Sequence, residues 1–267
     1  MKNLKLTLAG LAVCFILQSS LAQHAHLHVN SKWSECSFQL DPSLTQEAWQ
    51  EFTKEAGLVA YFRPLIDASP IGAKKFEVSI LQWSTKIDDT KDAWNDTFVH
   101  PDSTHWLVEG PRLPIPGLTF RAGINDRLDA ALYFTKSIGA NYGFWGAQIQ
   151  YNLISNTEKN WAASVRGNFT SMYGPDDLNL NIGGVDLIAS KEFPILADRI
   201  SIAPYAGISG YVSSSHEKTE AVNLDDEIVA GGQGMVGAVM KLYFARIGVE
   251  YNLAKVNTIS FKIGATF

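Results

Sequence analysis

The chain has 267 residues, of which 46% are hydrophobic and 18% charged, and its formal net charge is −5 at pH 7. This composition excludes a disordered chain and a bundle of membrane-spanning helices. A mildly acidic chain is also a poor binder of nucleic acid, so we expect no nucleic-acid partner.

The first 22 residues have the pattern of a secretory signal peptide. Lys2 and Lys5 form its basic end, residues 6–17 its apolar stretch and residues 20–22 its small-residue cleavage site. The apolar stretch is shorter than the roughly 20 residues that a membrane-spanning helix needs, so we predict cleavage near Ala22 instead of an uncleaved anchor. Loss of the two lysines lowers the net charge of −5 by two.

Cysteine and histidine residues near the new N-terminus give two further expectations. Only Cys36 remains after cleavage, so no intrachain disulfide can form. His24, His26 and His28 alternate along the chain, and in an extended segment they would share a face that could bind a metal ion. The competing interpretation is a flexible histidine-rich terminus that binds metals opportunistically. We assign no metal and no cofactor.

The N-terminal segment, residues 23–56, is predicted to contain a short helix over about residues 42–56. Asp41 suits its N-cap, Pro42 suits its first turn and Gly57 could end it. One face of this helix is apolar and consists of Leu44, Ala48, Phe52 and Ala56. The helix could be a plug in a lumen, a periplasmic lid or a helix packed on a barrel rim.

Residues 57–267 contain long segments in which apolar and polar residues alternate, which is typical of β-strands. Residues 161–173 carry this pattern as far as the roughly 9 to 11 residues of a tilted membrane strand, whereas strands of soluble proteins average about 5 to 6. Aromatic residues such as Trp145 and Tyr173 collect at strand ends, as in interfacial girdles. We therefore predict an all-β fold, a transmembrane antiparallel up-and-down β-barrel, over a lipocalin-like soluble barrel or a sandwich.

The last segment is the most specific feature. Its alternate apolar positions are Ile259, Phe261, Ile263, Ala265 and Phe267. Here the chain resembles Gram-negative outer-membrane barrels, whose final strand ends in phenylalanine with apolar residues at every second position before it. The resemblance covers about residues 57–267. It implies an integral location in the outer membrane, contact with its lipid and recognition by the barrel-assembly machinery, and it implies no particular activity.

The alternation predicts eleven strands. They lie near residues 57–65, 74–87, 113–124, 128–137, 143–154, 160–173, 178–193, 200–213, 228–242, 244–253 and 257–267. Bacterial single-chain barrels normally have an even number of strands. Either residues 29–40 add a twelfth strand, which we favour, or residues 57–65 are not a barrel strand and ten remain, so about 10–12 strands are expected.

The connections follow the asymmetry of short periplasmic turns and longer outer loops. Placing Phe267 on the periplasmic side puts short turns near Asn125, 156–159 and 194–199 inside. The loops 88–112 and 214–226 then lie outside.

The strand that starts at Leu178 changes its apolar parity partway along. The change falls at Gly183 and Gly184, which predicts a β-bulge there.

Charged residues at the polar positions of the strands are predicted to line the lumen. They are Glu77, Arg121, Asp129, Arg166, Asp186, Lys241, Arg246, Glu250 and Lys262. Three ion pairs are expected between neighbouring strands, namely Arg121 with Asp129, Arg166 with Asp186, and Glu250 with Lys262. Lys241 and Arg246 would remain as a positive pair near the periplasmic mouth. The charges either line an open pore or form a salt-bridge network that fills a narrow interior.

These patterns predict a non-enzymatic barrel, either a narrow porin or transporter for small solutes or a structural component of the membrane. The alternative is an outer-membrane acyl hydrolase or protease with its site in the outer loops. Its candidate residues are His100, Asp102, Ser103 and His105 in one loop and Ser215, His216 and Glu217 in another. Because such residues are also ordinary loop content, we assign none of them as catalytic.

Overall fold

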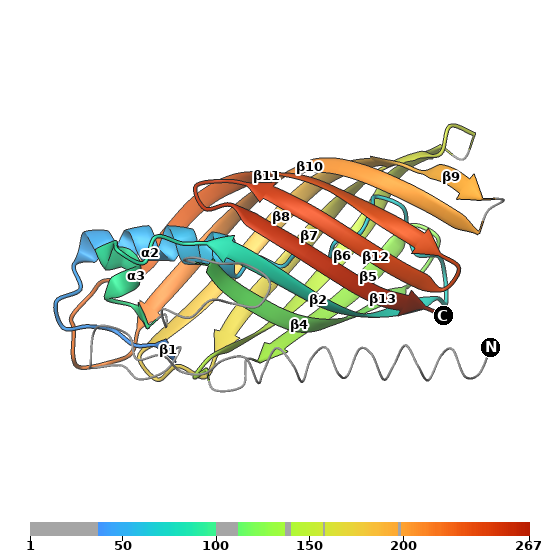
Figure 1. The fold of residues 1–267 in the computed structure, drawn as a ribbon. Coiled ribbons are helices and arrows are strands. Elements are labelled where there is room, and N and C mark those ends of the chain that lie inside the picture. The colour runs from blue at the N-terminus through green and yellow to red at the C-terminus, as the bar shows by residue number, and fades with distance from the viewer. Residues whose placement is uncertain (1–36, 100–111, 137–139, 157, 197–198) are drawn as a thin grey trace.

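The computed structural model describes residues 37–99, 112–136, 140–156, 158–196 and 199–267. Ten antiparallel strands form a closed barrel, because β13 pairs with β2 and β10 pairs with β11. Figure 1 shows the strands tilted around one lumen. The barrel strands are β2 (Phe76–Lys86), β4 (Arg112–Gly123), β5 (Leu128–Lys136), β6 (Gly143–Asn156), β7 (Trp161–Tyr173), β8 (Leu178–Lys191), β10 (Ile200–Glu217), β11 (Glu227–Leu242), β12 (Ala245–Leu253) and β13 (Thr258–Thr266). A short strand, β9 (Phe193–Leu196), pairs only with β10.

The barrel has ten strands and begins at β2, so the preference for twelve was wrong, as was the domain boundary at residue 57. Residues 57–59 end a helix, and residues 60–65 are irregular chain without strand pairing. Residues 29–36 lie outside the described part. Beyond them, β1 (Ser37–Phe38) pairs with β3 (Phe98–Val99) and not with the barrel.

Helix α2 (Gln46–Val59) begins and ends later than the sequence predicts. Its N-cap is Thr45, whose hydroxyl accepts from the Ala48 N–H at 3.2 Å. Asp41 instead accepts from Ser43 in the preceding turn. Gly57 does not end the helix but lies inside it. The helix packs so closely on β10 there that a Cβ at residue 57 would lie 2.7 Å from the Cβ of Ser213. Neither α2 nor α3 (Asp92–Asn95), the two helices of the described chain, is long and apolar enough to cross a membrane.

The two ends of the barrel differ. The turn end carries Phe267, the start of β2 and the β4–β5 and β11–β12 turns, and the loop end carries α2, α3, β1 and the longer connections (Figure 1). The chain leaves α2 at the loop end and must enter β2 at the turn end. Residues 60–75, the threaded segment, therefore run along the lumen, and residues 60–68 are buried.

The apolar face of the wall changes sides along the barrel. In β8 the buried inward residues are Leu180 and Ile182 near the loop end but Asp186 and Ser190 near the turn end. The pairing of β8 with β7 and with β10 has no register shift across Gly183 and Gly184, so the predicted β-bulge is wrong. The parity change marks a change of environment along a regular strand.

An aromatic core fills the loop half of the barrel. Side chains of α2 pack on α3, β1 and the inward face of the wall: Trp49 stacks on Phe52 with ring centroids 5.4 Å apart, and Phe38 lies 4.7 Å from Phe98. The turn half is different, with exposed apolar residues outside and mainly polar residues inside, beside a small buried apolar cluster that includes Ala68 and Ile188. Such an apolar outer band is suited to lipid.

Replacing Phe52, which is fully buried, tests this core. We expect Phe52→Ala to lower the free energy of unfolding by about 3–5 kcal/mol, because it removes a large side chain and leaves a cavity. Urea unfolding of refolded protein measures the change. The control Phe193→Ala, at an exposed position in β9, should cost much less. Equal losses would contradict a packed core around α2.

Candidate functional site in the lumen

The predicted lumen charges lie on the inward face of the wall. Seven of the nine are buried, whereas Lys241 and Arg246 are partly exposed at the turn end. Arg121 and Asp129 form an ion pair, and Arg166 lies opposite Asp186 with Nη1 3.9 Å from Oδ2.

The predicted pair of Glu250 with Lys262 does not form. The β12–β13 register places Glu250 opposite Ser260 and Lys262 opposite Gly248. The Lys262 ammonium instead pairs with Glu77, with Nζ 2.8 Å from Oε1, across the strands that close the barrel. Glu250 accepts a hydrogen bond from the Tyr205 hydroxyl at 2.7 Å.

Lys241 is not left as an unpaired positive charge either. Its Nζ lies 3.0 Å from Asp67 of the threaded segment and 2.7 Å from Glu192 after β8. Arg246 donates to the carbonyls of Tyr243 and Ala245. The turn-end mouth is therefore neutralised in part by the threaded segment.

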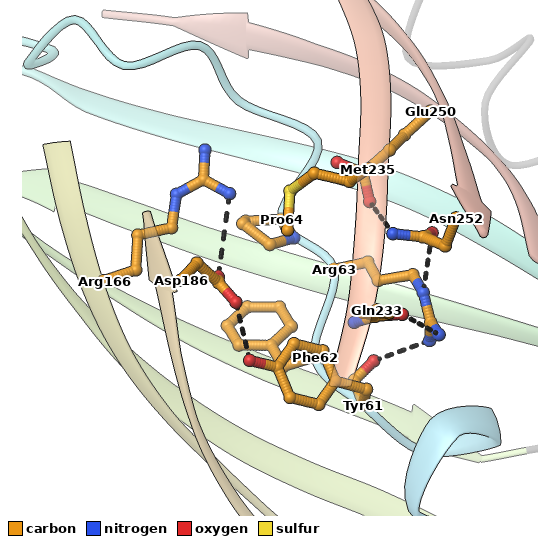
Figure 2. A pocket seen from close by; sticks show the side chains of 10 residues that line it. All are labelled: Tyr61, Phe62, Arg63, Pro64, Arg166, Asp186, Gln233, Met235, Glu250 and Asn252. Carbon is orange, nitrogen blue, oxygen red and sulfur yellow. Dashed lines mark hydrogen bonds and ion pairs between the residues drawn. The ribbon is translucent and has the colours of Figure 1, made fainter. Parts of the chain in front are cut away.

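Tyr61 fixes the part of the threaded segment nearest the loop end to β7 and β8. Its hydroxyl donates to Asp186 at 2.6 Å (Figure 2). The same hydroxyl accepts from Asn168 at 2.9 Å. Gly184 makes this approach possible, because a Cβ there would lie 2.4 Å from the Tyr61 hydroxyl. The sequence suggested a β-bulge at Gly184, but the glycine is explained by the close approach of Tyr61 from the threaded segment.

Arg63 is a buried charge in the lumen that the strand pattern does not reveal. Its guanidinium is buried and donates to the carbonyls of Leu58 (2.5 Å) and Tyr61 (2.9 Å) and to Asn252 of β12 (2.9 Å). A cation at the C-terminus of a helix satisfies free carbonyls and complements the helix dipole. The one sequence signal was an arginine just after an amphipathic helix.

Wall side chains also bind the backbone of the threaded segment. The carbonyl of Ser69 accepts from Arg121 at 3.1 Å, and that of Ala68 accepts from Asn152 at 3.0 Å. The Ala68 N–H donates to Ser190 at 3.1 Å.

Between the threaded segment and the wall, ten residues line a small recess (Figure 2). They are Tyr61, Phe62, Arg63, Pro64, Arg166, Asp186, Gln233, Met235, Glu250 and Asn252. The space between them is too narrow for a water molecule. The threaded segment therefore packs closely on the wall at this level.

The loop-end residues proposed for an enzyme do not form a site where they are described. Ser215 and His216 point to opposite faces of β10: the Ser215 hydroxyl lies 2.5 Å from that of Thr53 in α2, while His216 is exposed beside Asp226. Glu217 ends the same strand. The predicted candidates His100, Asp102, Ser103 and His105 lie outside the described residues.

The proposed metal site at His24, His26 and His28 also lies outside them. Within the described ranges, no group of three or more His, Cys, Asp or Glu side chains could hold a metal ion.

Two loops clamp α2 at the loop end. Glu51 lies 2.7 Å from Lys255 in the β12–β13 connection and 2.9 Å from Lys91 before α3, and Glu55 lies 3.1 Å from Lys255. Hydrogen bonds from Lys255 and Lys91 lower the pKa of Glu51 from 4.5 to about 2.

The residues of the predicted assembly signal form the outward face of the last strand. Phe261, Ile263 and Phe267 are exposed, and Ile259 and Ala265 are partly exposed. Their role in barrel assembly remains a prediction.

Comparison with known proteins finds distant structural matches and no sequence relative. No family model and no curated protein matches the chain. Among solved structures, a COG4313 outer membrane channel from Pseudomonas putida F1 is similar with 12% identity and a TM-score of 0.42, over 78% of this chain and 100% of that one. The outer membrane enzyme PagL has 12% identity and a TM-score of 0.33, over 71% and 98%. Ail of Yersinia pestis has 12% identity and a TM-score of 0.29, over 73% and 99%.

The closed ten-strand wall with its apolar outer face decides the class. The protein is an integral outer-membrane β-barrel. Its structural neighbours include channels and enzymes, so they assign no role to this barrel.

Charge reversal tests the pairing of Arg166 with Asp186. Arg166→Glu should destabilise the refolded barrel, because it places two carboxylates side by side in a buried site. Adding Asp186→Arg should recover part of the loss in urea unfolding. Full additivity of the two changes would show that the side chains do not interact.

The clamp on α2 predicts a pH dependence. Because folding lowers the pKa of Glu51 from 4.5 to about 2, its stabilising effect is present above pH 4.5 and is lost as the pH falls towards 2. The stability difference between the wild type and Glu51→Gln should therefore shrink over this range in urea unfolding. Glu47→Gln, which removes a helix carboxylate without an ion pair among the described residues, is the control. A difference independent of pH would refute the clamp.

Proposed function

We propose that the protein is a closed, non-enzymatic barrel that anchors a folded cap in the outer membrane. The cap comprises β1, α2, α3 and β3, which lie together at the loop end. The observation that carries the proposal is the filling of the lumen, by an aromatic core in the loop half and by the buried residues 60–68 of the threaded segment beyond it. Since longer loops of bacterial barrels face outward, the cap would face the cell exterior.

The cap is held by apolar packing that a small displacement would break. Trp49, Phe52 and Trp94 are fully buried against one another and the wall. The Asn141 side chain also binds the Phe38 N–H and carbonyl, each at 2.9 Å. Each buried aromatic side chain contributes several kcal/mol to a core, roughly 3–5 when it is truncated. This supports a fixed cap over one that opens in each transport cycle.

The threaded segment is held by charge. Asp67 pairs with Lys241, and Tyr61 binds Asp186. Withdrawing the segment would break both contacts, although Lys241 would keep Glu192 and Asp186 would keep Arg166. Each broken contact costs free energy, because the groups lie in a largely buried site. The network supports the interpretation of the lumen charges as a filling and not as a pore lining.

A gated transporter for small solutes is the second candidate, favoured by specific features of the same segment and of the wall around it. Leu65 has a φ of 50°, a left-handed conformation that is unfavourable for a leucine. The buried polar atoms Gln148 Oε1, Thr170 Oγ1 and Ser213 Oγ have no hydrogen-bond partner in the described structure. Strain and unpaired polar groups are typical of segments that move.

Planar-bilayer conductance separates the two roles. We expect mature, refolded protein to show no single-channel openings, because the threaded segment and cap block the lumen. In a Cys36→Ser background, a disulfide between Ala68→Cys and Ser190→Cys would lock the segment to β8, where the two residues are hydrogen-bonded. If the barrel is closed, neither the disulfide-locked nor the reduced protein should show single-channel openings.

Openings in the reduced protein that disappear on oxidation would establish the gated transporter instead. A form without residues 37–72 is the positive control, since an emptied barrel should conduct if it folds. Heat-modified electrophoretic mobility confirms that each variant is a folded barrel before it is measured.

A further inference from the structure

Three cationic residues share the outer face of the barrel at the loop ends of adjacent strands. They are Lys86 of β2, Arg112 of β4 and Lys136 of β5. Lys86 and Arg112 are directly opposite in the register, and Lys136 stands two residues beyond the exposed Phe134 on the same face. The three cations therefore lie just above the apolar outer band.

No carboxylate neutralises these cations within the described part of the chain. Lys136 donates to the carbonyls of Ala140 (2.8 Å) and Tyr142 (3.3 Å), and Arg112 reaches only the Ser84 carbonyl at 3.4 Å. Lys91 and Lys255 at the same end are, in contrast, paired with Glu51. The outward cations thus keep their charge available to a partner outside the chain.

The wall below these cations has an interruption between β4 and β5. Among the described residues their ladder stops at Leu118 opposite Phe134, although β5 continues to Lys136 and β4 pairs with β2 along almost all of its length. Pro116 would face Lys136 if the register continued, and proline has no N–H to donate to β5. Pro114 precedes it on the same face, and the residues that would face Pro114 lie outside the described part. The Thr135 hydroxyl donates to the Pro116 carbonyl in place of a backbone bond.

We propose that this place is a binding site for an anionic lipid of the membrane. Lys86, Arg112 and Lys136 would hold the phosphate of the headgroup, and an acyl chain would lie along Pro114 and Pro116 towards Leu118 and Phe134. Basic residues at the membrane interface attract anionic headgroups, and arginine matches phosphate geometry. A lipid is the occupant because the interruption is continuous with the lipid-facing band, where Leu118 is 50% exposed. The inference holds whether or not the lumen conducts.

Spin-labelled lipids test the headgroup. Refolded mature protein in phosphatidylcholine vesicles is compared for its association with trace spin-labelled phosphatidylglycerol and phosphatidylcholine. We expect a preference for phosphatidylglycerol, which the triple variant Lys86→Gln/Arg112→Gln/Lys136→Gln lowers at least about fivefold. The matched control Lys74→Gln/Lys75→Gln/Lys191→Gln removes three cations from the turn end and should keep the preference. An equal loss in both triple variants would overturn the proposal.

The prolines test the acyl part. Pro114→Val/Pro116→Val restores two backbone donors and should reduce the number of immobilised lipids without changing headgroup preference. Pro204→Val, at an outward position inside the β10–β11 ladder, should change neither. Unchanged immobilisation in the double variant would overturn a lipid in this interruption. So would full displacement of phosphatidylglycerol by inorganic phosphate, since that would show an anion site without an acyl contact.

Discussion

A chain segment inside a barrel must have its polar groups paired by the wall, and this constraint organises the molecule. Backbone groups of residues 66–69 bind wall side chains that include Arg121, Asn152 and Ser190. Buried backbone groups without partners are costly. The inward charges of the wall therefore serve the threaded segment as well as one another. The sequence predicted Lys241 as an unpaired cation, but the threaded segment brings Asp67 beside it and the two form an ion pair.

The second determinant is the change of environment along each strand. In β2 the inward residues are Glu77 and Ser79 near the turn end, and Leu81 and Trp83 near the loop end. The first pair faces the threaded segment, in the part of the wall whose outer side is suited to lipid. The second pair faces the aromatic core around α2. One wall thus combines a membrane barrel with a core like that of a soluble protein. The lipid site we propose lies where these two regions meet.

The sequence predicted most of this wall, and its failures have physical reasons. Period-two alternation located every barrel strand from β2 to β13, and Phe267 indicated the class. The bulge at Gly183 and Gly184 was inferred because a parity change was taken for a break in the strand. The pairing of Glu250 with Lys262 failed because a register shift of two residues keeps each side chain on its face and changes its neighbour.

The position of the threaded segment could not be predicted from local sequence patterns. The alternation of residues 57–65 predicted a strand, which does not form, and the wall partners of Arg63 and Asp67 come from strands more than 100 residues away. Only barrel closure brings these groups together. The interpretation of the inward charges as a filling was open in the sequence, and the position of this segment is what favours it.

Cysteine accessibility tests the central claim, that residues 60–75 occupy the lumen, most directly. In a Cys36→Ser background, Ala68→Cys replaces a fully buried residue and Lys74→Cys an exposed one at the turn end. The account predicts that a membrane-impermeant maleimide labels position 74 rapidly and position 68 only after denaturation. Labelling of both positions at the same rate in folded protein would show that the segment lies outside the lumen and would contradict the account.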